Sequence, residues 1–420
     1  MRVVIAGGGI GGLVLALSLF ELGLDVTVYE AVEQVQPLGV GINLLPHAVR
    51  ELTELGLRPQ LEAAGVLTAE LAYYSKHGKR IWSEPRGLDA GYRWPQISIH
   101  RGRLHLLLLE EARERLGSER IKLGHALSQF EAGERDVQVR FVDRREQTPR
   151  DVVTCDVLVG ADGMHSRVRA LLHPKDGAPV WNGTLLWRGV TDAAPFLTER
   201  SMIMAGHAEQ KFVCYPIEAP RAGVQRINWI AELRSAPSQL AAKEDWNATG
   251  NLEDFLPRFA DWKYDWLDVP RLITEAERVH VYPLVDRDPL PEWTRGRVTL
   301  LGDAAHPMYP VGSNGASQAI LDARVLTGCL RDGATVQASL ARYEAERRPL
   351  TTALTMANRK QGPEECMTLV EARAPDGFDR IDDVISHDEL VQISAKYKQL
   401  AGFTVDELNR RPSLSQLSYV

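Results

Sequence analysis

Cysteine is scarce in this chain of 420 residues, and positive charge is not in excess. The four cysteines, at positions 155, 214, 329 and 366, form neither a CxxC pair nor a Cys/His cluster. This argues against a zinc site or a disulfide framework and favours a reducing cytosol. Because 49 Lys and Arg stand against 56 Asp and Glu, a net charge of −7, we expect no metal and no nucleic-acid partner.

A long apolar segment without interruption is also lacking. The stretch from Val3 to Leu24 comes nearest, but five of its first ten residues are glycines and Glu21 interrupts its end. Such glycine crowding is typical of a buried strand, turn and helix and not of a signal peptide or a membrane span. We therefore expect a cytoplasmic protein that has no membrane partner.

Several segments show the periodicity of regular elements. A strand (residues 2–6), a glycine turn, a helix and a second strand (25–30) form a βαβ unit that opens a parallel sheet. Between residues 40 and 56 a glycine-bounded loop leads into a helix. A further helix is predicted over 101–116, strands near 138–143 and 156–160, a resumed strand at 297–303, and helices over about 316–330 and 336–358.

The composition changes near residue 181, where strand-like, aromatic-rich segments begin, and their alternation predicts an antiparallel sheet. The fold class is thus α/β, a Rossmann-like dinucleotide-binding domain with an inserted antiparallel β-sheet domain and a helical C-terminal region. The predicted boundaries are 1–72, 97–180 and 281–360 for the discontinuous dinucleotide-binding domain, 73–96 and 181–280 for the substrate-binding sheet domain, and 361–420 for the C-terminal extension.

The first motif is a GxGxxG turn formed by Gly7, Gly9 and Gly12, with Ile10 and Gly11 between them. The glycines allow a tight turn, close approach of backbone amides to a diphosphate, and close packing of helix on strand. Glu30 ends the next strand, 18 residues after Gly12, where it can accept from a ribose hydroxyl and would oppose a 2′-phosphate. The alternative is a glycine-rich turn with an unrelated surface Glu.

The second motif is the turn at Asp162 and Gly163, which follows a buried strand and precedes a helix that begins near Ser166. This turn can cap the helix and approach a nucleotide. A purely structural connection between strand and helix explains it equally well.

The third motif is LLGDAAHPMYPVGSNG at 300–315. Asp303, at the end of a parallel strand, can accept from ribityl hydroxyls, and the glycines at 312 and 315 present amides at the next helix start, suited to an anionic reduced flavin. The motif indicates FAD. A local structural role for His306 is favoured over proton transfer.

With these three motifs in this order, the chain resembles the single-component FAD-dependent aromatic hydroxylases, relatives of salicylate and p-hydroxybenzoate hydroxylases. It is most similar to the phenazine hydroxylases of pyocyanin biosynthesis. The segments that carry this likeness are IWSEPRG at 81–87, SIHRGRL at 98–104, WRGVT at 187–191, FADW at 259–262, YPLVDRDPLP at 282–291 and NGASQAILD at 314–322.

The resemblance implies a role for each matching position. The AMP half of FAD would be held by the glycine turn and Glu30, the flavin nucleotide chain by Arg101, and the ribityl chain by Asp303. Asp162 would belong to the turn shared by FAD and the pyridine nucleotide. The flavin ring would be flanked by two segments, Gly39 to Ile42 including Gly41 as a mobile loop, and Gly312, Asn314, Gly315 and Ala316. Ser317 stands where many members have Asn, which puts a side-chain contact in doubt.

The implied reaction is that of an NAD(P)H-consuming monooxygenase with bound FAD, O2 and a transient NADH or NADPH. Oxygen would pass from a flavin C4a-hydroperoxide to an electron-rich ring, phenazine-like or another aromatic, with or without loss of a carboxylate. The protein would exclude water and orient the substrate. A monomer or homodimer is expected, and a small aromatic molecule is the expected partner.

Substrate contacts are expected between the inserted sheet and the flavin. The candidates are Asn43, Trp187, Arg188, Tyr215, Trp229, Met308 and Pro310, of which Pro310, Tyr215 and Asn43 are also the catalytic candidates. Tyr215 could hydrogen-bond a ring substituent and Arg188 could pair with a carboxylate, but a core tyrosine and a sheet-edge WRG segment are the competing interpretations. Trp262, Tyr264 and Trp266 are expected to pack.

Two other functions remain open at this point. One is a flavin-dependent halogenase or reductase of the same fold, although the WxWxIP segment expected of such a halogenase is missing. The other is a flavin-binding redox sensor that does not turn over.

Overall fold

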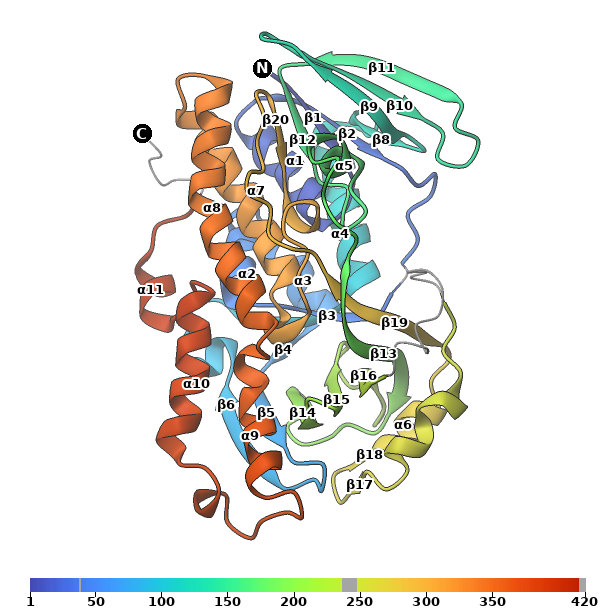
Figure 1. Cartoon of the computed structure of the whole chain (residues 1–420), viewed down its shortest axis with the longest axis vertical. Coiled ribbons are helices and arrows are strands. Elements are labelled where there is room, and N and C mark those ends of the chain that lie inside the picture. Colours follow the sequence, from blue (N-terminus) through green and yellow to red (C-terminus); the bar gives the residue numbers. More distant parts are fainter. Residues whose placement is uncertain (38, 236–247, 415–420) are drawn as a thin grey trace.

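The computed structural model describes residues 1–37, 39–235 and 248–414 (Figure 1). One end of the molecule holds a parallel sheet of five strands, in which every paired register runs in the same direction. In spatial order these strands are β20 (Val298–Leu300), β12 (Val157–Gly160), β1 (Arg2–Ala6), β2 (Asp25–Glu30) and β8 (Ile121–Leu123). The inner strands are buried almost throughout, as is usual where helices cover both faces.

Long helices cover this sheet. Helix α1 (Ile10–Glu21) packs against α4 (Arg101–Leu116) and α7 (Gly315–Asp332), and α7 packs against α8 (Val336–Asn358). The predicted helices over 101–116 and 336–358 are confirmed, and Pro349 lies inside α8. The predicted helix over 316–330 is one residue longer at its start and two longer at its end.

A seven-stranded sheet forms the second large layer, and the predicted inserted sheet is confirmed. Its strands in spatial order are β19 (Val279–Asp286), β13 (Val180–Ala193), β16 (Gln225–Arg234), β15 (Gln210–Pro216), β14 (Ser201–His207), β5 (Glu70–Tyr74) and β6 (Arg80–Pro85). Pairing is antiparallel except between β14 and β5. Strand β14 is buried at six of its seven positions, so it lacks the alternation by which strands are recognised in a sequence.

Two predicted domain boundaries cut through elements of this sheet. Strand β19 pairs with β13 up to Asp286, whereas the sequence predicts that the dinucleotide-binding domain resumes at residue 281. Strand β5 begins at Glu70 rather than after residue 72. We propose that the sheet domain takes in both strands completely.

Three smaller sheets complete the strand inventory. They contain β3 (Gly41–Leu44), β7 (Gln96–His100) and β4 (Gly65–Thr68); β11 (Pro149–Cys155), β10 (Val137–Val142) and β9 (Ala126–Ala132); and β17 (Lys263–Tyr264) with β18 (Leu267–Asp268). The remaining helices are α2 (Pro46–Glu54), α3 (Arg58–Ala64), α5 (Arg167–Leu172), α6 (Val269–Thr274), α9 (Glu365–Arg373), α10 (His387–Leu400) and α11 (Val405–Arg410).

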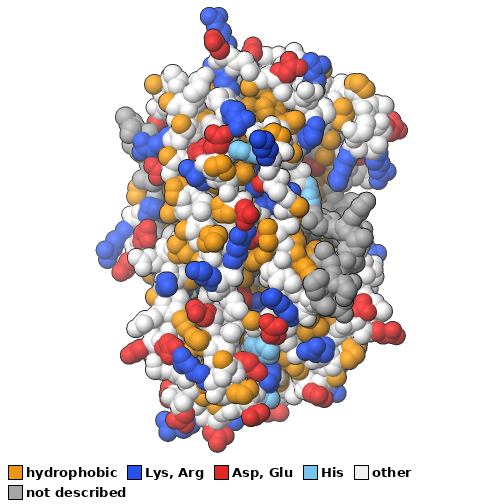
Figure 2. Space-filling view, viewed as in Figure 1, with side chains coloured by type: hydrophobic (Ala, Val, Ile, Leu, Met, Phe, Trp, Pro, Cys, Tyr) orange, Lys and Arg blue, Asp and Glu red, His pale blue; other side chains and the backbone are white. Residues whose placement is uncertain are grey.

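The C-terminal helices do not form a separate body. Helix α9 packs on β14, and α10 packs on α8 and α9, so the extension runs down one side of the molecule and joins both large layers (Figure 1). Residues 415–420 of the predicted extension lie outside the described residues. On the face shown in Figure 2, basic and acidic side chains are interspersed. None of the described helices is both long and apolar enough to cross a membrane.

Candidate functional site

The turn after β1 requires glycine at two positions. Gly7 has a φ of +112°, and a Cβ there would lie 2.2 Å from the carbonyl oxygen of Ala161. A Cβ on Gly12 would lie 2.1 Å from the carbonyl oxygen of Gly7. Gly7 also donates its N–H to the carbonyl of Tyr29, at 2.8 Å. The turn is therefore pressed between β2 and the segment that follows β12, with no room for a side chain.

The first turn of α1 presents backbone amides. Its N-cap is Gly9, no side chain caps it, and no acidic residue lies in the first turn that starts at Ile10. A Cβ on Gly9 would meet no atom within 4 Å, whereas one on Gly11 would lie 2.7 Å from Leu301. Gly9 therefore faces open space and Gly11 packs on the protein. Open amides at the positive end of a helix suit a diphosphate.

Glu30 at the end of β2 turns back onto the glycine turn. Its carboxylate accepts the N–H of Gly8 at 2.7 Å and the N–H of Val32 at 3.0 Å. His105 on α4 hydrogen-bonds the Gly8 carbonyl at 2.6 Å. Because each carboxylate oxygen can accept more than one bond, a ribose hydroxyl can still bind here, and that contact stays a prediction.

Asp162 caps helix α5. Its carboxylate accepts the hydroxyl of Ser166, the N–H of Arg167 at 2.7 Å and the N–H of Val168 at 3.2 Å. Burial raises the pKa of Asp162 against the opposing effect of these hydrogen bonds. The Asp162 side chain thus has a structural role in joining β12 to α5, which was the alternative interpretation. The backbone of the same turn lies against Gly7.

Asp303 and Arg101 offer charges of opposite sign at the ends of two elements. Asp303 lies just beyond β20, and its side chain is exposed. Removal of water by the surrounding protein raises the pKa of its carboxyl, whereas His306 and Arg101 lower it. Arg101 begins α4, and its N–H bonds the carbonyl of Val40 at 3.0 Å. Across the described ranges, no hydrogen bond or ion pair engages the Asp303 carboxylate. Its position beyond a parallel strand suits the hydroxyls of a cofactor chain.

The segment that leads into α7 is shaped by its backbone. Pro310 is exposed, and Gly312 has a φ of +66° with its missing Cβ only 2.2 Å from the hydroxyl oxygen of Tyr397. Asn314 is fully buried and donates to the same hydroxyl at 3.0 Å. A Cβ on Gly315 would meet no atom within 4 Å, and no side chain caps α7. The Asn314 side chain thus points inward, and the amides at the start of α7 stay open.

Tyr397 is a contributor that the sequence did not reveal. Its hydroxyl lies 3.0 Å from the carbonyl oxygen of Val311 and 3.0 Å from Oδ1 of Asn358, so it can donate to one of the two while Asn314 donates to it. Burial raises its pKa. It lies 83 positions after Asn314, and no motif links the two. It fixes the loop before α7 from the side of α10.

Ser317 and Ala316 differ in what they can contact. Ser317 is fully buried, and its hydroxyl accepts the N–H of Leu45 at 3.3 Å. The serine therefore joins α7 to the N-cap of α2. Ala316 is partly exposed beside the open amides.

His306 belongs to a buried ionic cluster. Its Nε2 lies 2.5 Å from the carboxylate of Asp322, which also accepts from Arg347 at 2.6 Å and from the N–H of Gly302 at 3.1 Å. Burial alone would raise the pKa of Asp322, but His306 and Arg347 lower it to about 2. The structural role expected for His306 is supported, with its partner on α7 and not within the loop. The cluster ties α8 to the loop that carries Asp303.

The predicted mobile loop over Gly39 to Ile42 is wrong for its second half. Gly41 and Ile42 belong to β3 and pair with β7. Gly41 donates its N–H to Oδ1 of Asn228 at 2.6 Å, and a Cβ on it would lie 2.8 Å from that side chain. Gly39, with a φ of +106° and next to Arg101, remains in a loop. The backbone pairing and the close approach of β16 explain why the segment is extended.

Arg188 on β13 and Tyr215 on β15 share the face of the sheet that looks toward β3. The guanidinium of Arg188 donates to the carbonyl of Gly41 at 3.1 Å, and Tyr215 pairs in register with Asn228. Burial raises the pKa of Tyr215 to about 12 against the opposing effect of Arg188. Nε of Arg188 is buried without a partner, and among the described residues no carboxylate forms a salt bridge with it. Arg188 is thus a half-buried cation whose Nε is buried and which has no acidic partner among the described residues.

Trp187 and Trp229, predicted to contact substrate, lie on the opposite face. Trp187 stacks on Phe255 with ring centroids 4.8 Å apart, and Trp229 donates to the hydroxyl of Thr191 at 3.0 Å. Both belong to the core between the sheet and α6, because successive strand residues alternate in direction and Arg188 points the other way. We withdraw both as substrate candidates. Trp262, Tyr264 and Trp266 also pack on that face.

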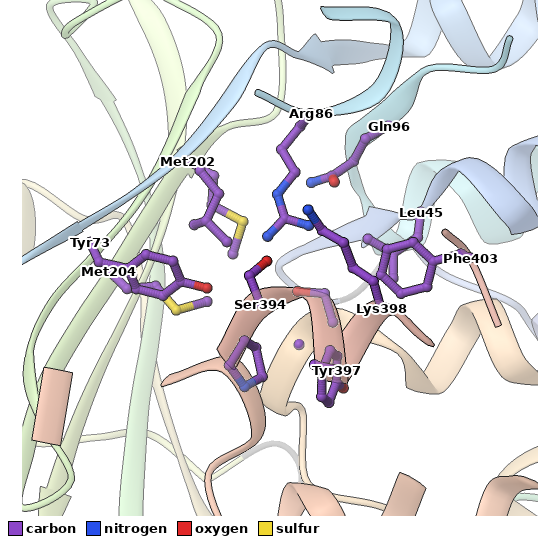
Figure 3. A pocket seen from close by; sticks show the side chains of 14 residues that line it. Leu45, Tyr73, Arg86, Gln96, Met202, Met204, Ser394, Tyr397, Lys398 and Phe403 are labelled. Atoms are coloured by element: carbon purple, nitrogen blue, oxygen red, sulfur yellow. The ribbon is translucent and has the colours of Figure 1, made fainter. Parts of the chain in front are cut away.

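Asn43 and Met308 are buried near the loop. Oδ1 of Asn43 accepts from the hydroxyl of Ser98 at 2.6 Å, while its amide nitrogen has no partner. Met308 packs in a small cluster with Leu45 and Leu354. A substrate contact for either remains a prediction. A cavity borders the loop before α7, and it lies between the β5 and β14 side of the sheet and α10 (Figure 3).

The described residues fit a flavin adenine dinucleotide. Two glycine positions leave no room for a Cβ, two long helices begin with open amides, and Asp303 offers an unpaired carboxylate. FAD, when bound, takes a hydride from NAD(P)H and activates O2. The glycine turn and the open start of α7 would hold the two ends of the cofactor, and the sheet face would then be left for a second ligand.

Comparison with known proteins identifies the family. Residues 1–358 match the family described as "FAD binding domain". The chain is 46% identical to phenazine 1,6-dicarboxylic acid hydroxylase PhzS of Lysobacter antibioticus over 367 residues, which cover 86% of this chain and 90% of that protein. It is 32% identical to 3-amino-4-hydroxybenzoate 2-monooxygenase of Streptomyces cremeus, with 87% of each chain covered.

Solved structures show the same fold. A salicylate hydroxylase substrate complex superposes with a TM-score of 0.75 at 23% identity and covers 99% of this chain and 98% of its own. HpxO of Klebsiella pneumoniae, complexed with FAD and uric acid, gives a TM-score of 0.71 at 23% identity, with 97% and 95% covered. The predicted Rossmann-like fold with an inserted sheet is confirmed, and the halogenase and redox-sensor alternatives are set aside. The chain belongs to the FAD-binding-domain family and is an FAD-dependent aromatic monooxygenase that consumes NAD(P)H and O2.

Proposed function

We propose that the enzyme hydroxylates a phenazine that carries a carboxylate, and that Arg188 and Tyr215 hold this substrate. The observation that carries the proposal is the half-buried Arg188 guanidinium, whose Nε is buried without a partner, which has no acidic partner among the described residues and which shares its sheet face with Tyr215. Removing part of a cation from water without pairing it with an anion is costly. A substrate carboxylate would offset that cost. The named specificity of the PhzS relative for a phenazine dicarboxylic acid supports the same choice.

The roles we propose for the other residues follow from their placement. The glycine turn and Glu30 bind the adenosine half of FAD, Asp303 and Arg101 bind its central chain, and the amides between 312 and 316 face the ring. Gly41, which is held by Asn228 and Arg188, lies on the side of the flavin ring opposite to these amides. Asn43 and Pro310 stay as proposed substrate neighbours. The proposed reaction needs no acid–base pair, and the placement of the described residues at this site does not call for one.

Turnover of phenazine-1-carboxylate and phenazine-1,6-dicarboxylate by the purified holoenzyme tests the proposal. Hydroxylation with retention of the carboxylate adds one oxygen atom to the substrate. Hydroxylation at the carbon that bears the carboxylate replaces it: the substrate carboxylate, O2, NAD(P)H and two protons give the phenol, CO2, water and NAD(P)+. Labelled O2 must place its label in the new hydroxyl, and the product mass distinguishes the two courses.

Unsubstituted phenazine and salicylate serve as comparison substrates. We expect the phenazine carboxylates to give the highest coupled turnover, meaning product formed per NAD(P)H consumed. Coupled turnover of salicylate with none of the phenazines would contradict the proposed substrate class, while the assignment as an aromatic monooxygenase would stand.

A further inference from the structure

A second group of unpartnered polar side chains lies away from Arg188, in the cavity of Figure 3. The cavity is bounded by Gly312 and Ser313 of the loop before α7, by Met202 and Met204 of β14, and by α10. Its volume is about 20 Å³, room for a water molecule or a carboxylate group and not for a whole ring system. A ligand here would insert only one end.

Three of the lining side chains are more than nine-tenths buried and leave polar atoms without a partner. They are Tyr73, 1% exposed, with its hydroxyl; Arg86, 8% exposed, with its Nε; and Gln96, 2% exposed, with its Oε1. Figure 3 shows the Tyr73 hydroxyl and the Arg86 guanidinium pointing toward the middle of the cavity. Such groups are normally hydrogen-bonded. Tyr73 and Arg86 offer donors, whereas the unpartnered Oε1 of Gln96 is an acceptor, which a protonated carboxyl group or a water molecule can satisfy.

The charged residues that line the cavity, Arg86 and Lys398, are both basic. Arg86 pairs with Glu84, which also accepts from Lys398 at 2.6 Å and from Ser394 at 2.7 Å. One carboxylate therefore serves two cations. The nearby Lys211 is shared by two carboxylates, those of Glu232 and Glu364, so the two networks together are neutral and the basic character is confined to the lining. A bound carboxylate would complete the partners of Arg86.

The rest of the lining is apolar. Leu45, Leu71, Met202, Met204 and Phe403 contribute side chains without a strong hydrogen-bonding group. Thioethers and aliphatic groups adapt to the flat edge of an aromatic ring. The ligand class is therefore an aromatic carboxylate, with its acidic group at the polar end.

The cavity and the Arg188 site are linked by two elements. Strand β3 runs from Gly41, which bonds Arg188, to Leu44, and Leu45 lines the cavity, a span of about 13 Å at strand geometry. On the sheet, Met202 belongs to the same buried cluster as Tyr215. This span joins backbone positions, so a three-ring molecule with carboxylates on opposite edges would reach both sites only with the help of the long side chains of Arg188 and Arg86.

We propose that the cavity formed by Tyr73, Arg86 and Gln96 is a second carboxylate subsite, so that the enzyme selects aromatic dicarboxylates over monocarboxylates. This inference rests on the proposed phenazine carboxylate function, with Arg188 holding the first carboxylate. Tyr73, Arg86 and Gln96 are specificity residues, because they bind the end of the substrate remote from Arg188.

The test measures ligand affinity by the perturbation of the flavin spectrum in the holoenzyme. The probes are phenazine-1,6-dicarboxylate, phenazine-1-carboxylate, unsubstituted phenazine and benzoate. Tyr73→Phe removes a hydroxyl that has no protein partner, so the melting temperature should not fall. Its affinity for the dicarboxylate should fall about tenfold, and its affinity for phenazine should not change. Arg86→Gln should weaken dicarboxylate and benzoate binding further.

Tyr74→Phe is the matched control, since Tyr74 is the next residue of β5 and packs on Trp266 at the opposite face. Its affinities should equal those of the wild type. Equal affinities for all four probes in Tyr73→Phe, Arg86→Gln and wild type would overturn the subsite and leave the proposed function standing. Failure of the wild type to bind any phenazine would overturn the proposed function, and the benzoate series would still decide the subsite. If the wild type binds no probe at all, both proposals fail.

Discussion

Around the turn after β1, the groups available to a ligand are backbone amides, and the residues that shape them lie close together in the chain. On the face of the seven-stranded sheet toward β3, they are side chains from β13, β15, β16 and β5, assisted by α10. Amides in a glycine turn serve any diphosphate, so one arrangement suits many enzymes. Side chains on a sheet can change one by one without disturbing the strands, and this allows the substrate to differ between relatives.

Gly7→Ala should break the first of these regions most severely. Its Cβ would lie 2.2 Å from the Ala161 carbonyl, and the residue has a positive φ, so the turn must distort. We expect protein that is poorly folded and colourless. Gly9→Ala is the sharper comparison, since its Cβ meets nothing within 4 Å: it should melt like the wild type but retain less FAD. Normal flavin content in Gly7→Ala would contradict the geometry.

Asp322→Asn should test the cluster that holds the loop carrying Asp303 to α7 and α8. The substitution leaves Arg347 and His306 without their anion, and we expect the free energy of unfolding to fall by about 3–5 kcal/mol. Because the pKa of Asp322 is lowered from 3.8 to about 2, its contribution is complete above pH 3.8 and is lost as the pH falls toward 2. Denaturant unfolding across this range measures the loss. Asp406→Asn, at an exposed pair of 3.8 Å, should change little.

Arg188→Gln should affect the sheet face alone. Removing one partner of a buried charge pair costs at least tenfold in affinity, so Kd for a phenazine carboxylate should rise by about tenfold or more. FAD content should change little, because Gly41 loses its bond to Arg188 but keeps its bond to Asn228 and its pairing with β7. Trp187→Phe, one residue earlier on the opposite face, is the control. An equal loss of affinity in both variants would mean that the sheet, and not the guanidinium, is responsible.

Asp303→Ala and Tyr215→Phe should separate cofactor from substrate. Loss of the Asp303 carboxylate should weaken FAD retention by about tenfold, the scale of one hydrogen bond to a charged group. Tyr215→Phe should keep its FAD and instead consume more NAD(P)H per product formed. Flavin absorbance after matched purification gives the first quantity and product yield the second. Equal FAD content in Asp303→Ala and wild type would argue against the role of Asp303.

Tyr397→Phe should have the smallest effect. Loss of its hydrogen bonds to the loop before α7 should lower the free energy of unfolding by about 1 kcal/mol and reduce the yield of product per NAD(P)H. Tyr92→Phe also loses one buried bond, from its hydroxyl to the Phe403 carbonyl at 2.6 Å, but does not touch the loop. Reduced coupling in both variants would show that general stability, and not the loop, controls the yield.

The sequence predicted the elements whose signals are local. The helix over 101–116 and the helix over 336–358 were placed correctly, because their apolar residues recur with helical period. Strands β5 and β14 were missed since their buried runs lack alternation. Because glycine usually marks a loop, the sequence predicts a loop at Gly41. In the structure the missing side chain of Gly41 instead allows Asn228 to approach.

Contacts between segments that are distant in the sequence were predicted less accurately. Trp187 and Arg188 are neighbours in the WRG segment, yet they face opposite sides of the sheet, and only the register of β13 with β16 decides which side each takes. No motif predicts Tyr397 or the cavity at Tyr73, because the partners of Tyr397 lie up to 86 positions away and the cavity is lined by residues from 45 to 403.

Local sequence was enough to predict the dinucleotide site, since a diphosphate-binding turn and an open helix start are made by consecutive residues whose backbone conformation their own side chains dictate. The reaction class came from the resemblance that longer segments carry, such as those at 282–291 and 314–322. Only the tertiary structure decided which charged and aromatic side chains meet beside them. Strand register and the packing of α10 place Arg188, Tyr215 and Arg86 on one side of the sheet. Substrate recognition depends on that long-range assembly, which short segments do not encode.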